Sequence, residues 1–470
     1  MKKSFKNTAE NAEPQALEDL FDNIKPDKVS KKTVSDITAR VVDNEKKEKK
    51  PVFKRIISVA AAVVCLSLIF VAVIGVINRG GASSVQAADL MEGIEPRDLG
   101  QIRKVDPASA AKAADFAVRL FKQTAKNDSN NVLISPLSVL SALAMTQNGA
   151  SGETLKQMEQ TLGMGADEIN AFFRSYLDSL KNGENCKFEL ANSIWFKDVP
   201  DFSVKRGFLQ KNADYYGAGA YKVPFDDSTL RDINGWVNKK TDGMIKEILD
   251  KIPDDAVMYL INALCFDAEW DEKYDVYSVN KRTFTTESGE KRRVTMMSNL
   301  EDVYFDDGKA TGFLKYYKGK RYAFVAMLPN EGVTVDEYIS SLDGQAVYEM
   351  LSNPEYCAVS AWVPKFEIEY GTEMSDVLKA MGMTAAFDAS ADFSGMSDKD
   401  LLINRVIHKT FISVTETGTR AGAATLVEMS AGAMIEEIKE VHLDRPFVYM
   451  LVDTETNIPF FIGTVTDVGK

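Results

Sequence analysis

Histidine is nearly absent from this 470-residue sequence, which contains only His408 and His442. A Ser-His-Asp triad, or a metal centre built on several histidines, therefore has almost no residues to use. The sequence also lacks a G-x-S-x-G nucleophile elbow, an HExxH helix and a Walker loop. Carboxylate clusters such as Asp254-Asp255 are typical of solvated turns, and hydrolysis by paired carboxylates is the enzymatic alternative that remains. The sequence predicts no catalytic residues, no metal site and no cofactor.

The sequence also has few cysteines and no excess of basic residues. The four cysteines, Cys65, Cys186, Cys265 and Cys357, contain no CxxC pair and are too few for a disulfide-stapled domain. We expect small buried thiols and no required disulfide. The formal net charge is -13, whereas a nucleic-acid partner needs a surplus of Lys and Arg gathered on one face. No nucleic-acid partner is expected.

Long hydrophobic runs are absent with one exception, residues 56–77, which as a helix would span about 33 Å and match a bilayer. Basic residues precede this run, so the positive-inside rule predicts a cytoplasmic N-terminus and an extracellular remainder. The prediction is a cytoplasmic flexible tail at 1–55, a transmembrane helix or signal anchor at 56–77 and a linker at 78–104. Alternatively, small residues before Ala88 favour a cleavable signal peptide and a protein secreted after cleavage near Ala87.

The remaining residues, 105–470, have the pattern of a globular domain. Helical spacing occurs at residues 108–125 and again after Ser135-Pro136. Later runs rich in β-branched and aromatic residues predict strands at 191–197, 257–268, 322–328, 358–366, 406–415, 447–453 and 460–465. Helices that come mainly first and strands that come mainly later predict an α+β fold class.

Several short motifs occur in a fixed order along this domain. Residues 131–145 read NVLISPLSVLSALAM, and residues 148–154 read NGASGET. Further along the chain come ANSIWF at 191–196, INGWVN at 233–238, LINALCF at 260–266, PKF at 364–366, ADFSG at 391–395, VIHK at 406–409 and RPF at 445–447. The set resembles the serpins, a family of serine protease inhibitors. The resemblance implies the serpin fold for residues 105–470, with three β-sheets, eight or nine helices and an exposed reactive-centre loop.

Residues 416–425 read ETGTRAGAAT and resemble the hinge of that loop. The hinge residues that the resemblance implies are Glu416, Gly418, Thr419, Ala421, Gly422, Ala423, Ala424 and Thr425. Because side chains alternate along a strand, small residues at every second position would face the core if Thr419 does. Proline is absent from residues 416–435, so every residue there has the backbone N–H that pairing with a neighbouring strand requires. In the family, a protease cuts the loop, the hinge inserts into the central sheet, and the acylated protease is trapped.

The resemblance thus implies a suicide inhibitor of extracellular serine proteases that acts as a monomer and forms a covalent complex with its target. Arg420 departs from the acidic residue usual in the family, but its outward position in the alternation makes the change tolerable. A non-inhibitory serpin that acts as a binding module is the alternative. A bulky or charged inward residue in the hinge would favour that alternative, and none is present.

The position of the cut is left open by the sequence. Counting forward from Glu416 gives the bond from Gly432 to Ala433, and counting back from Arg445 gives Ile435. The candidate scissile residues are Met429, Ala431, Gly432, Ala433, Met434 and Ile435. No Lys or Arg lies between Ala421 and Ile438, so we expect elastase-like or subtilisin-like targets rather than trypsin-like ones.

Five further residues match two regions that govern opening of the central sheet in the family. Ser135, Ser138, Asn262 and His408 match the shutter, a polar cluster beneath the sheet. Trp270 matches the breach, where the hinge first enters. We expect His408 to be buried and hydrogen-bonded, without catalytic work.

Overall fold

The computed structural model describes residues 87–126, 128, 130–180, 186–253, 256–419 and 438–469. The chain divides into two units, residues 1–83 and residues 84–470, and every described residue belongs to the second. The predicted tail at 1–55 and the predicted membrane span at 56–77 therefore lie outside the described residues. Within the described ranges, no helix is both long enough and apolar enough to cross a bilayer.

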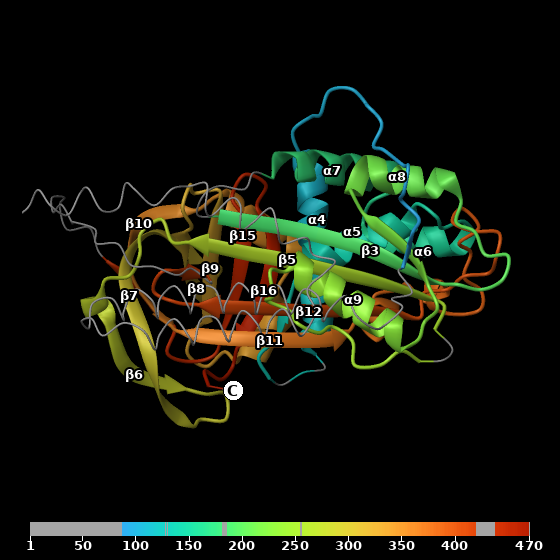
Figure 1. Ribbon diagram of the computed structural model, residues 1–470. Coiled ribbons are helices and arrows are strands. Elements are labelled where there is room, and N and C mark those ends of the chain that lie inside the picture. Colours follow the sequence, from blue (N-terminus) through green and yellow to red (C-terminus); the bar gives the residue numbers. More distant parts are fainter. Residues whose placement is uncertain are drawn as a thin grey trace, which may run out of the picture. The chain divides into compact units, whose positions relative to one another are not determined.

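Nine α-helices occur in the described ranges, and the first six precede most of the strands (Figure 1). They are α4 (Pro107–Ala125), α5 (Pro136–Gln147), α6 (Gly152–Leu162), α7 (Ala166–Ser179), α8 (Arg206–Tyr216), α9 (Asp227–Lys240), α10 (Val335–Ser341), α11 (Gly344–Ser352) and α12 (Ser375–Ala380). Two 3-10 turns, η2 (Val276–Ser278) and η3 (Ala385–Phe387), also occur in the described ranges. Helix α4 begins where Asp106 accepts a hydrogen bond from the Ser109 N–H at 3.0 Å. The predicted helices at 108–125 and after Ser135-Pro136 are confirmed.

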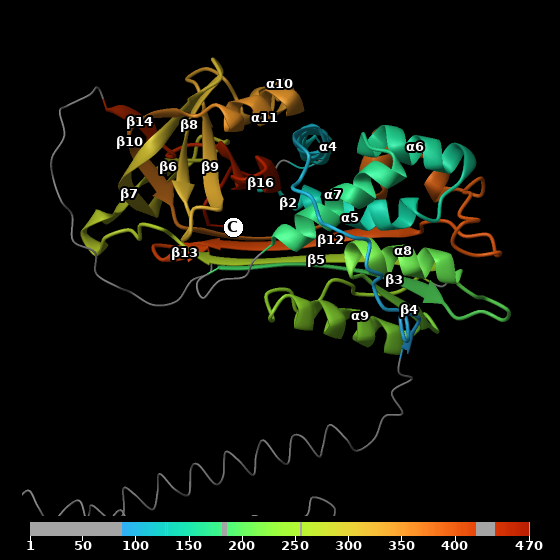
Figure 2. The same cartoon turned by 90° about the horizontal axis from the view of Figure 1, so that it is seen from above.

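A seven-stranded sheet has the order β1-β4-β3-β5-β13-β12-β11. Its strands are β1 (Ala88–Asp89), β4 (Gly219–Val223), β3 (Cys186–Lys197), β5 (Met258–Glu269), β13 (Gly418–Thr419), β12 (Arg405–Val414) and β11 (Phe366–Glu373). In Figure 2 this sheet is seen along its edge, with α9 on one face and α5 on the other. Both faces of its central strands are therefore buried.

A nine-stranded sheet contains the remaining strands in the order β14-β10-β7-β8-β9-β15-β16-β2, with β6 paired to β7. They are β14 (Lys439–His442), β10 (Glu355–Pro364), β7 (Lys291–Asp306), β8 (Ala310–Tyr316), β9 (Tyr322–Pro329), β15 (Phe447–Asp453), β16 (Ile458–Val465), β2 (Leu133–Ile134) and β6 (Val279–Thr285). Helix α4 packs against β16 and α11.

The α+β class is confirmed, but the described residues form two continuous ladders where three sheets were expected. Strand β7 explains the difference. Val294 and Met296 are buried on one face of this strand, whereas Glu301, Val303 and Phe305 are buried on the other. Since side chains alternate, β7 passes from one packing layer into the next without a break in its hydrogen bonds.

Six of the seven predicted strands are confirmed, with ends that differ from the prediction by at most five residues. The single strand predicted at 358–366 is wrong, because β10 ends at Pro364 and β11 begins at Phe366 in the other sheet. The chain turns at Lys365, whose N–H donates to the Thr295 carbonyl at 2.8 Å. Buried residues lie directly on both sides of this turn, Val363 and Pro364 before it and Phe366 after it, so the local hydropathy does not mark the turn.

Residues 87–104, which fall in the predicted linker, pack against the rest of the unit. Strand β1 pairs with β4 and covers that edge of the sheet. Arg97 donates from Nε to Asp214 of α8 at 2.8 Å, and Arg174 of α7 donates to the Gly100 carbonyl at 2.6 Å. Ile94 is buried in the core and Leu90 and Met91 pack against it, so backbone pairing, charged side chains and apolar contacts together hold this segment.

Candidate functional site: the strand-insertion seam

The candidate site is the seam between β5 and β12 in the middle of the seven-stranded sheet. The two strands are parallel neighbours where residues 259–262 pair with residues 405–408. Further along, β13 lies between them, because Thr419 pairs with both Ala268 of β5 and Val414 of β12. The seam is thus closed at one end and occupied by β13 at the other.

Between these two ends the ladder is interrupted. The parallel register would set residues 263–267 opposite residues 409–413, yet no pairing among the described residues joins these stretches. Their outer edges are paired, to β3 and to β11. Within the described ranges neither stretch has a strand neighbour on its seam side, which is the arrangement that accepts another strand.

The segment before β13 is fixed by the chain that follows β5. The Trp270 indole donates to the Thr415 carbonyl at 2.8 Å, and the Trp270 backbone N–H donates to the Thr417 carbonyl at 3.0 Å. The Tyr274 N–H donates to the Glu416 carbonyl at 3.1 Å. The root of the predicted loop is thus held by three hydrogen bonds to residues 270–274.

The two residues of β13 fit the seam closely. At Gly418 a Cβ atom would lie 2.2 Å from the Ala268 carbonyl oxygen, so only glycine lets the strand approach β5. Thr419 is 2% exposed, and its hydroxyl lies 2.5 Å from the Tyr317 hydroxyl. Trp270 stacks on Tyr317 with ring centroids 4.4 Å apart. Burial raises the pKa of Tyr317, so its hydroxyl stays protonated and available to donate.

A buried ion pair lies next to the aromatic rings of Trp270 and Tyr274. Lys315 Nζ is 2.7 Å from Glu301 Oε1, 4.5 Å from the Tyr274 ring centre and 5.6 Å from that of Trp270. Burial raises the pKa of Glu301, and the ion pair with Lys315 opposes that shift. Sequence reasoning missed this pair, although a lysine inside the apolar run of β8 is a usable signal.

At the closed end of the seam, three polar side chains form one row across the sheet. Asn192 of β3 pairs with Asn262 of β5, which pairs with His408 of β12. His408 Nε2 accepts from the Ser135 N–H at 2.9 Å, and Asn262 donates to the Ser138 carbonyl at 2.7 Å. Burial lowers the pKa of His408 to about 3, so its ring is neutral. The structure therefore brings the four predicted shutter residues together.

The same polar cluster includes Asn192 of β3 and Ser141 of α5, which the sequence analysis did not single out. Asn192 donates to the Ser141 hydroxyl at 2.7 Å and accepts from the Asn262 amide. Within the described residues, three buried atoms of the cluster have no hydrogen-bond partner: Ser135 Oγ, Asn262 Oδ1 and His408 Nδ1. The polar cluster is thus only partly satisfied at the last pairing before the interruption. An asparagine in the apolar run at 191–196 is the signal that could have found Asn192.

The remaining predicted loop residues lie outside the described ranges, namely Ala421, Gly422, Ala423, Ala424, Thr425, Met429, Ala431, Gly432, Ala433, Met434 and Ile435. After them, β14 runs parallel to β10 at the edge of the nine-stranded sheet. His442 stacks on Trp362 at 3.7 Å, and the Arg282 guanidinium lies 3.5 Å from the centre of the same indole. This stack fastens β14 to β10 and β6.

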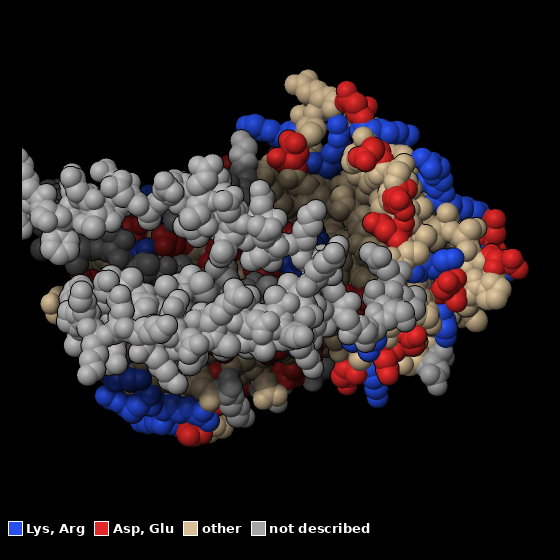
Figure 3. All heavy atoms as spheres, viewed as in Figure 1, with Lys and Arg blue, Asp and Glu red and all other residues tan. Residues whose placement is uncertain are grey.

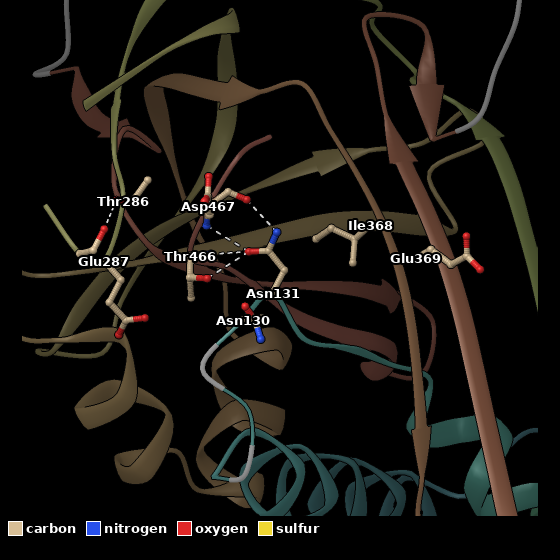
Figure 4. Close-up of a pocket in the computed structure, with 9 residues that line it drawn as sticks. Asn130, Asn131, Thr286, Glu287, Ile368, Glu369, Thr466 and Asp467 are labelled. Atoms are coloured by element: carbon tan, nitrogen blue, oxygen red, sulfur yellow. Dashed lines mark hydrogen bonds between the residues drawn. The ribbon is translucent and has the colours of Figure 1, made fainter. Parts of the chain in front are cut away.

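A polar hollow of about 500 Å³ lies away from the seam (Figure 4). It is lined by Asn130, Asn131, Thr286, Glu287, Ser288, Ile368, Glu369, Thr466 and Asp467. Asn131 accepts from the N–H groups of Thr466 and Asp467 and donates to the Asp467 carbonyl, so it fixes the end of the chain. The lining has no histidine or cysteine, and no group of three metal-ligating side chains occurs in the described ranges.

The sequence was compared with models of known protein families. The model of the serpins, the serine protease inhibitors, matches residues 111–468. The chain is a serpin. An uncharacterised serpin-like protein of Thermococcus kodakarensis is 33% identical over 74% of this chain and 83% of its own length. The leukocyte elastase inhibitor of Bos taurus is 31% identical over 75% of this chain and 97% of its own length.

Solved serpin structures match the described fold as well. The thermophilic serpin tengpin in its native state is 44% identical, covers 82% of this chain and all of its own, and superimposes with a TM-score of 0.78. Tengpin in its latent state gives a TM-score of 0.69 at the same identity. The described arrangement is therefore more similar to the native state. Human thyroxine-binding globulin complexed with thyroxine shares the fold, with 23% identity, 77% of this chain and 99% of its own covered, and a TM-score of 0.70.

Proposed function

We propose that this serpin is a suicide inhibitor of serine proteases and that the seam between β5 and β12 receives its cut loop. The observation that supports this most directly is β13, which already lies in the entrance of the seam. Beyond Thr419, the sequence supplies the small residues Ala421, Ala423 and Thr425 at every second position. Such side chains fit the buried face that Thr419 already occupies.

The chemistry would begin with attack of the protease's serine on the carbonyl carbon of the scissile residue. The amine of the next residue leaves, and the residue before the cut stays joined to the protease as an ester. Insertion along the seam would then form on the order of ten backbone hydrogen bonds at about 0.5–1.5 kcal/mol each. This energy would move the acylated protease along the sheet and distort its active site before water can release it.

The loop composition supports a target with an apolar specificity pocket. No Lys or Arg lies between Ala421 and Ile438, whereas small and apolar residues are frequent. An elastase-like or subtilisin-like protease accepts such residues. The similarity to a leukocyte elastase inhibitor points in the same direction.

Incubation of the chain with elastase and with subtilisin tests this function. We expect a covalent complex that survives denaturing gel electrophoresis, together with a C-terminal peptide whose mass locates the cut. The serpin fold alone does not decide the outcome, because thyroxine-binding globulin, whose structure holds thyroxine, has the same fold. Clean cleavage of the loop with an active protease left behind would favour the non-inhibitory alternative.

Replacing Thr419 by Arg tests insertion itself. Thr419 is buried against Tyr317, so Thr419→Arg would place an unpaired charge in the seam as the strand enters. We expect this variant to be cut as a substrate and to form at least tenfold less stable complex. Thr419→Val, which keeps size and burial, is the matched control and should retain complex formation. Equal complex yields in Thr419→Arg and the parent chain would contradict insertion through this seam.

We also propose that residues 56–77 display the inhibitor on the outer face of a membrane. The support is the apolar run with basic residues on its N-terminal side. Fractionation of cells that express the chain tests this, with the full-length protein expected in the membrane fraction. A soluble form that begins at Ala88 would favour secretion instead.

A further inference from the structure

Two charged side chains are buried together beside the entrance of the seam. Figure 3 shows many Lys, Arg, Asp and Glu side chains on one face of the described residues, where water surrounds them. Lys315 of β8 and Glu301 of β7 differ, because they are 1% and 8% exposed and their charged groups are 2.7 Å apart. Removal of two charges from water offsets most of their attraction, so two apolar side chains of similar size are often as stable in such a position. The pair therefore calls for an explanation other than stability.

The Lys315 ammonium also lies over two aromatic rings. It is 4.5 Å from the centre of the Tyr274 ring and 5.6 Å from that of Trp270. A cation attracts an aromatic ring most strongly where water is excluded, and both rings are buried. Strand register keeps the ammonium there, because Lys315 pairs with Phe324 of β9, whose ring lies edge-on to Trp270 with centroids 6.1 Å apart. The ammonium is thus held between a carboxylate and two aromatic rings.

Tyr274 depends on this ammonium more than Trp270 does. The Trp270 indole has a hydrogen bond of its own, to the Thr415 carbonyl at 2.8 Å. Within the described residues, by contrast, the buried Tyr274 hydroxyl has no hydrogen-bond partner. The orientation of the Tyr274 ring is therefore set by its edge-on packing against Trp270, with centroids 6.4 Å apart, and by the Lys315 ammonium.

The two aromatic residues connect Lys315 to the root of the loop. The Trp270 N–H donates to the Thr417 carbonyl at 3.0 Å, and the Tyr274 N–H donates to the Glu416 carbonyl at 3.1 Å. Because a ring that cannot turn restrains the backbone that carries it, a side chain that fixes both rings also fixes these two N–H groups. The root, from which β13 starts, is therefore held in register through Lys315.

We propose that Lys315, held by Glu301, is a positioning residue for loop insertion and acts on the root through Trp270 and Tyr274. This proposal rests on the proposed inhibitory function. After the cut, insertion competes with hydrolysis of the ester that joins the loop to the protease. A root in register lets the hinge pair with β5 and β12 at once, whereas a loose root delays the first pairs. The ion pair thus lowers the number of inhibitor molecules that are cut without trapping a protease.

The test compares full-length chains in their reaction with elastase and with subtilisin. Lys315→Met/Glu301→Met replaces the whole pair and leaves no unpaired buried charge, so this variant should melt no lower than the parent chain. It should nevertheless consume about threefold more inhibitor per trapped protease, and the amides of Trp270 and Tyr274 should exchange hydrogen about threefold faster. Lys315→Arg keeps a cation over the rings and should match the parent chain in both measurements.

A matched control and a coupling measurement sharpen the test. Arg292→Met/Asp467→Leu removes another largely buried ion pair, with charged groups 3.0 Å apart near the start of β7, and should leave consumption and exchange unchanged. In chains that already carry Tyr274→Leu, the nearer ring is absent. Replacement of Lys315 and Glu301 should then raise consumption by a smaller factor than in the parent chain. Equal factors in the two backgrounds would overturn positioning through Tyr274.

Failure of this proposal can be told apart from failure of the inhibitory function. If Lys315→Met/Glu301→Met forms covalent complex with unchanged consumption and unchanged amide exchange, the positioning role is overturned and the inhibitory function stands. If this variant melts lower and exchanges faster throughout the chain, the pair is only structural, which also overturns the positioning role. Absence of covalent complex from the parent chain would overturn the inhibitory function and the positioning role with it.

Discussion

At the scale of single residues, the neutral state of His408 links stability to pH. Its Nε2 accepts a hydrogen bond from Ser135, and burial holds its pKa at about 3 instead of 6.5. A base with a lowered pKa in the folded state takes up its proton first in the unfolded chain. Stability is therefore independent of His408 above about pH 6.5 and falls as the pH drops from there towards 3.

We expect His408→Gln to remove this contribution while Gln still offers an acceptor to Ser135. Between pH 6 and 5, the parent chain should lose about 1 kcal/mol more unfolding free energy than the variant. Urea titrations of both chains at several pH values from 7.5 to 5 measure the difference. Carboxylates titrate mainly below this window and are common to both chains. Parallel pH dependences would show that His408 becomes protonated in the folded state.

At the scale of elements, the short strand β13 is anchored by few contacts. Lys365 lies 2.8 Å from Glu416, with each side chain about a third exposed, so this pair contributes up to about 1 kcal/mol. We expect Glu416→Gln to loosen the root and speed amide hydrogen exchange of Trp270 and Tyr274 about twofold. Both amides donate to carbonyls of the root.

Asp376→Asn supplies the control for this prediction. It removes a more exposed ion pair with Lys379 on α12 and should leave the two amides unchanged. If Glu416→Gln protects Trp270 and Tyr274 as well as the parent chain does, the ion pair does not hold the root.

Among the helices and strands, those with a clear hydrophobic pattern within their own residues were the easiest to predict from the sequence. Alternation and apolar runs predicted β5 and β12, and motif order brought Asn262 and His408 into one cluster. Polar residues inside apolar runs mark Asn192 and Lys315, but their partners Asn262 and Glu301 follow from the register between strands, which no local pattern contains. Residues 87–104 gave no periodic signal, because backbone pairing at an edge and hydrogen bonds of two arginines hold them, together with a few apolar contacts near Ile94 that do not form a stripe.

At the scale of the whole molecule, the loop connects two different sheets. Strand β13 belongs to the seven-stranded sheet, and β14 belongs to the nine-stranded one. Under the proposed function, a cut between them would free β13 to extend along the seam while β14 stays in place. We expect the cut chain to unfold roughly 15 °C higher, since about ten new hydrogen bonds at about 1 kcal/mol each would be gained.

Calorimetry before and after limited cleavage, with the protease inactivated, measures this change. Thr419→Arg cut in the same way should gain much less, because its hinge cannot enter the seam. An unchanged melting temperature for the cut parent chain would mean that the loop does not insert.

The burial of β15 and β16 has a further consequence. Both strands are buried along their whole length, and they connect β9 to β2 inside the nine-stranded sheet. Once the loop is cut, no peptide bond joins residues 438–470 to the rest, yet these residues still supply two interior strands. The cut chain would then be a heterodimer of two fragments of one gene product, and its C-terminal segment would be a subunit held by noncovalent contacts alone.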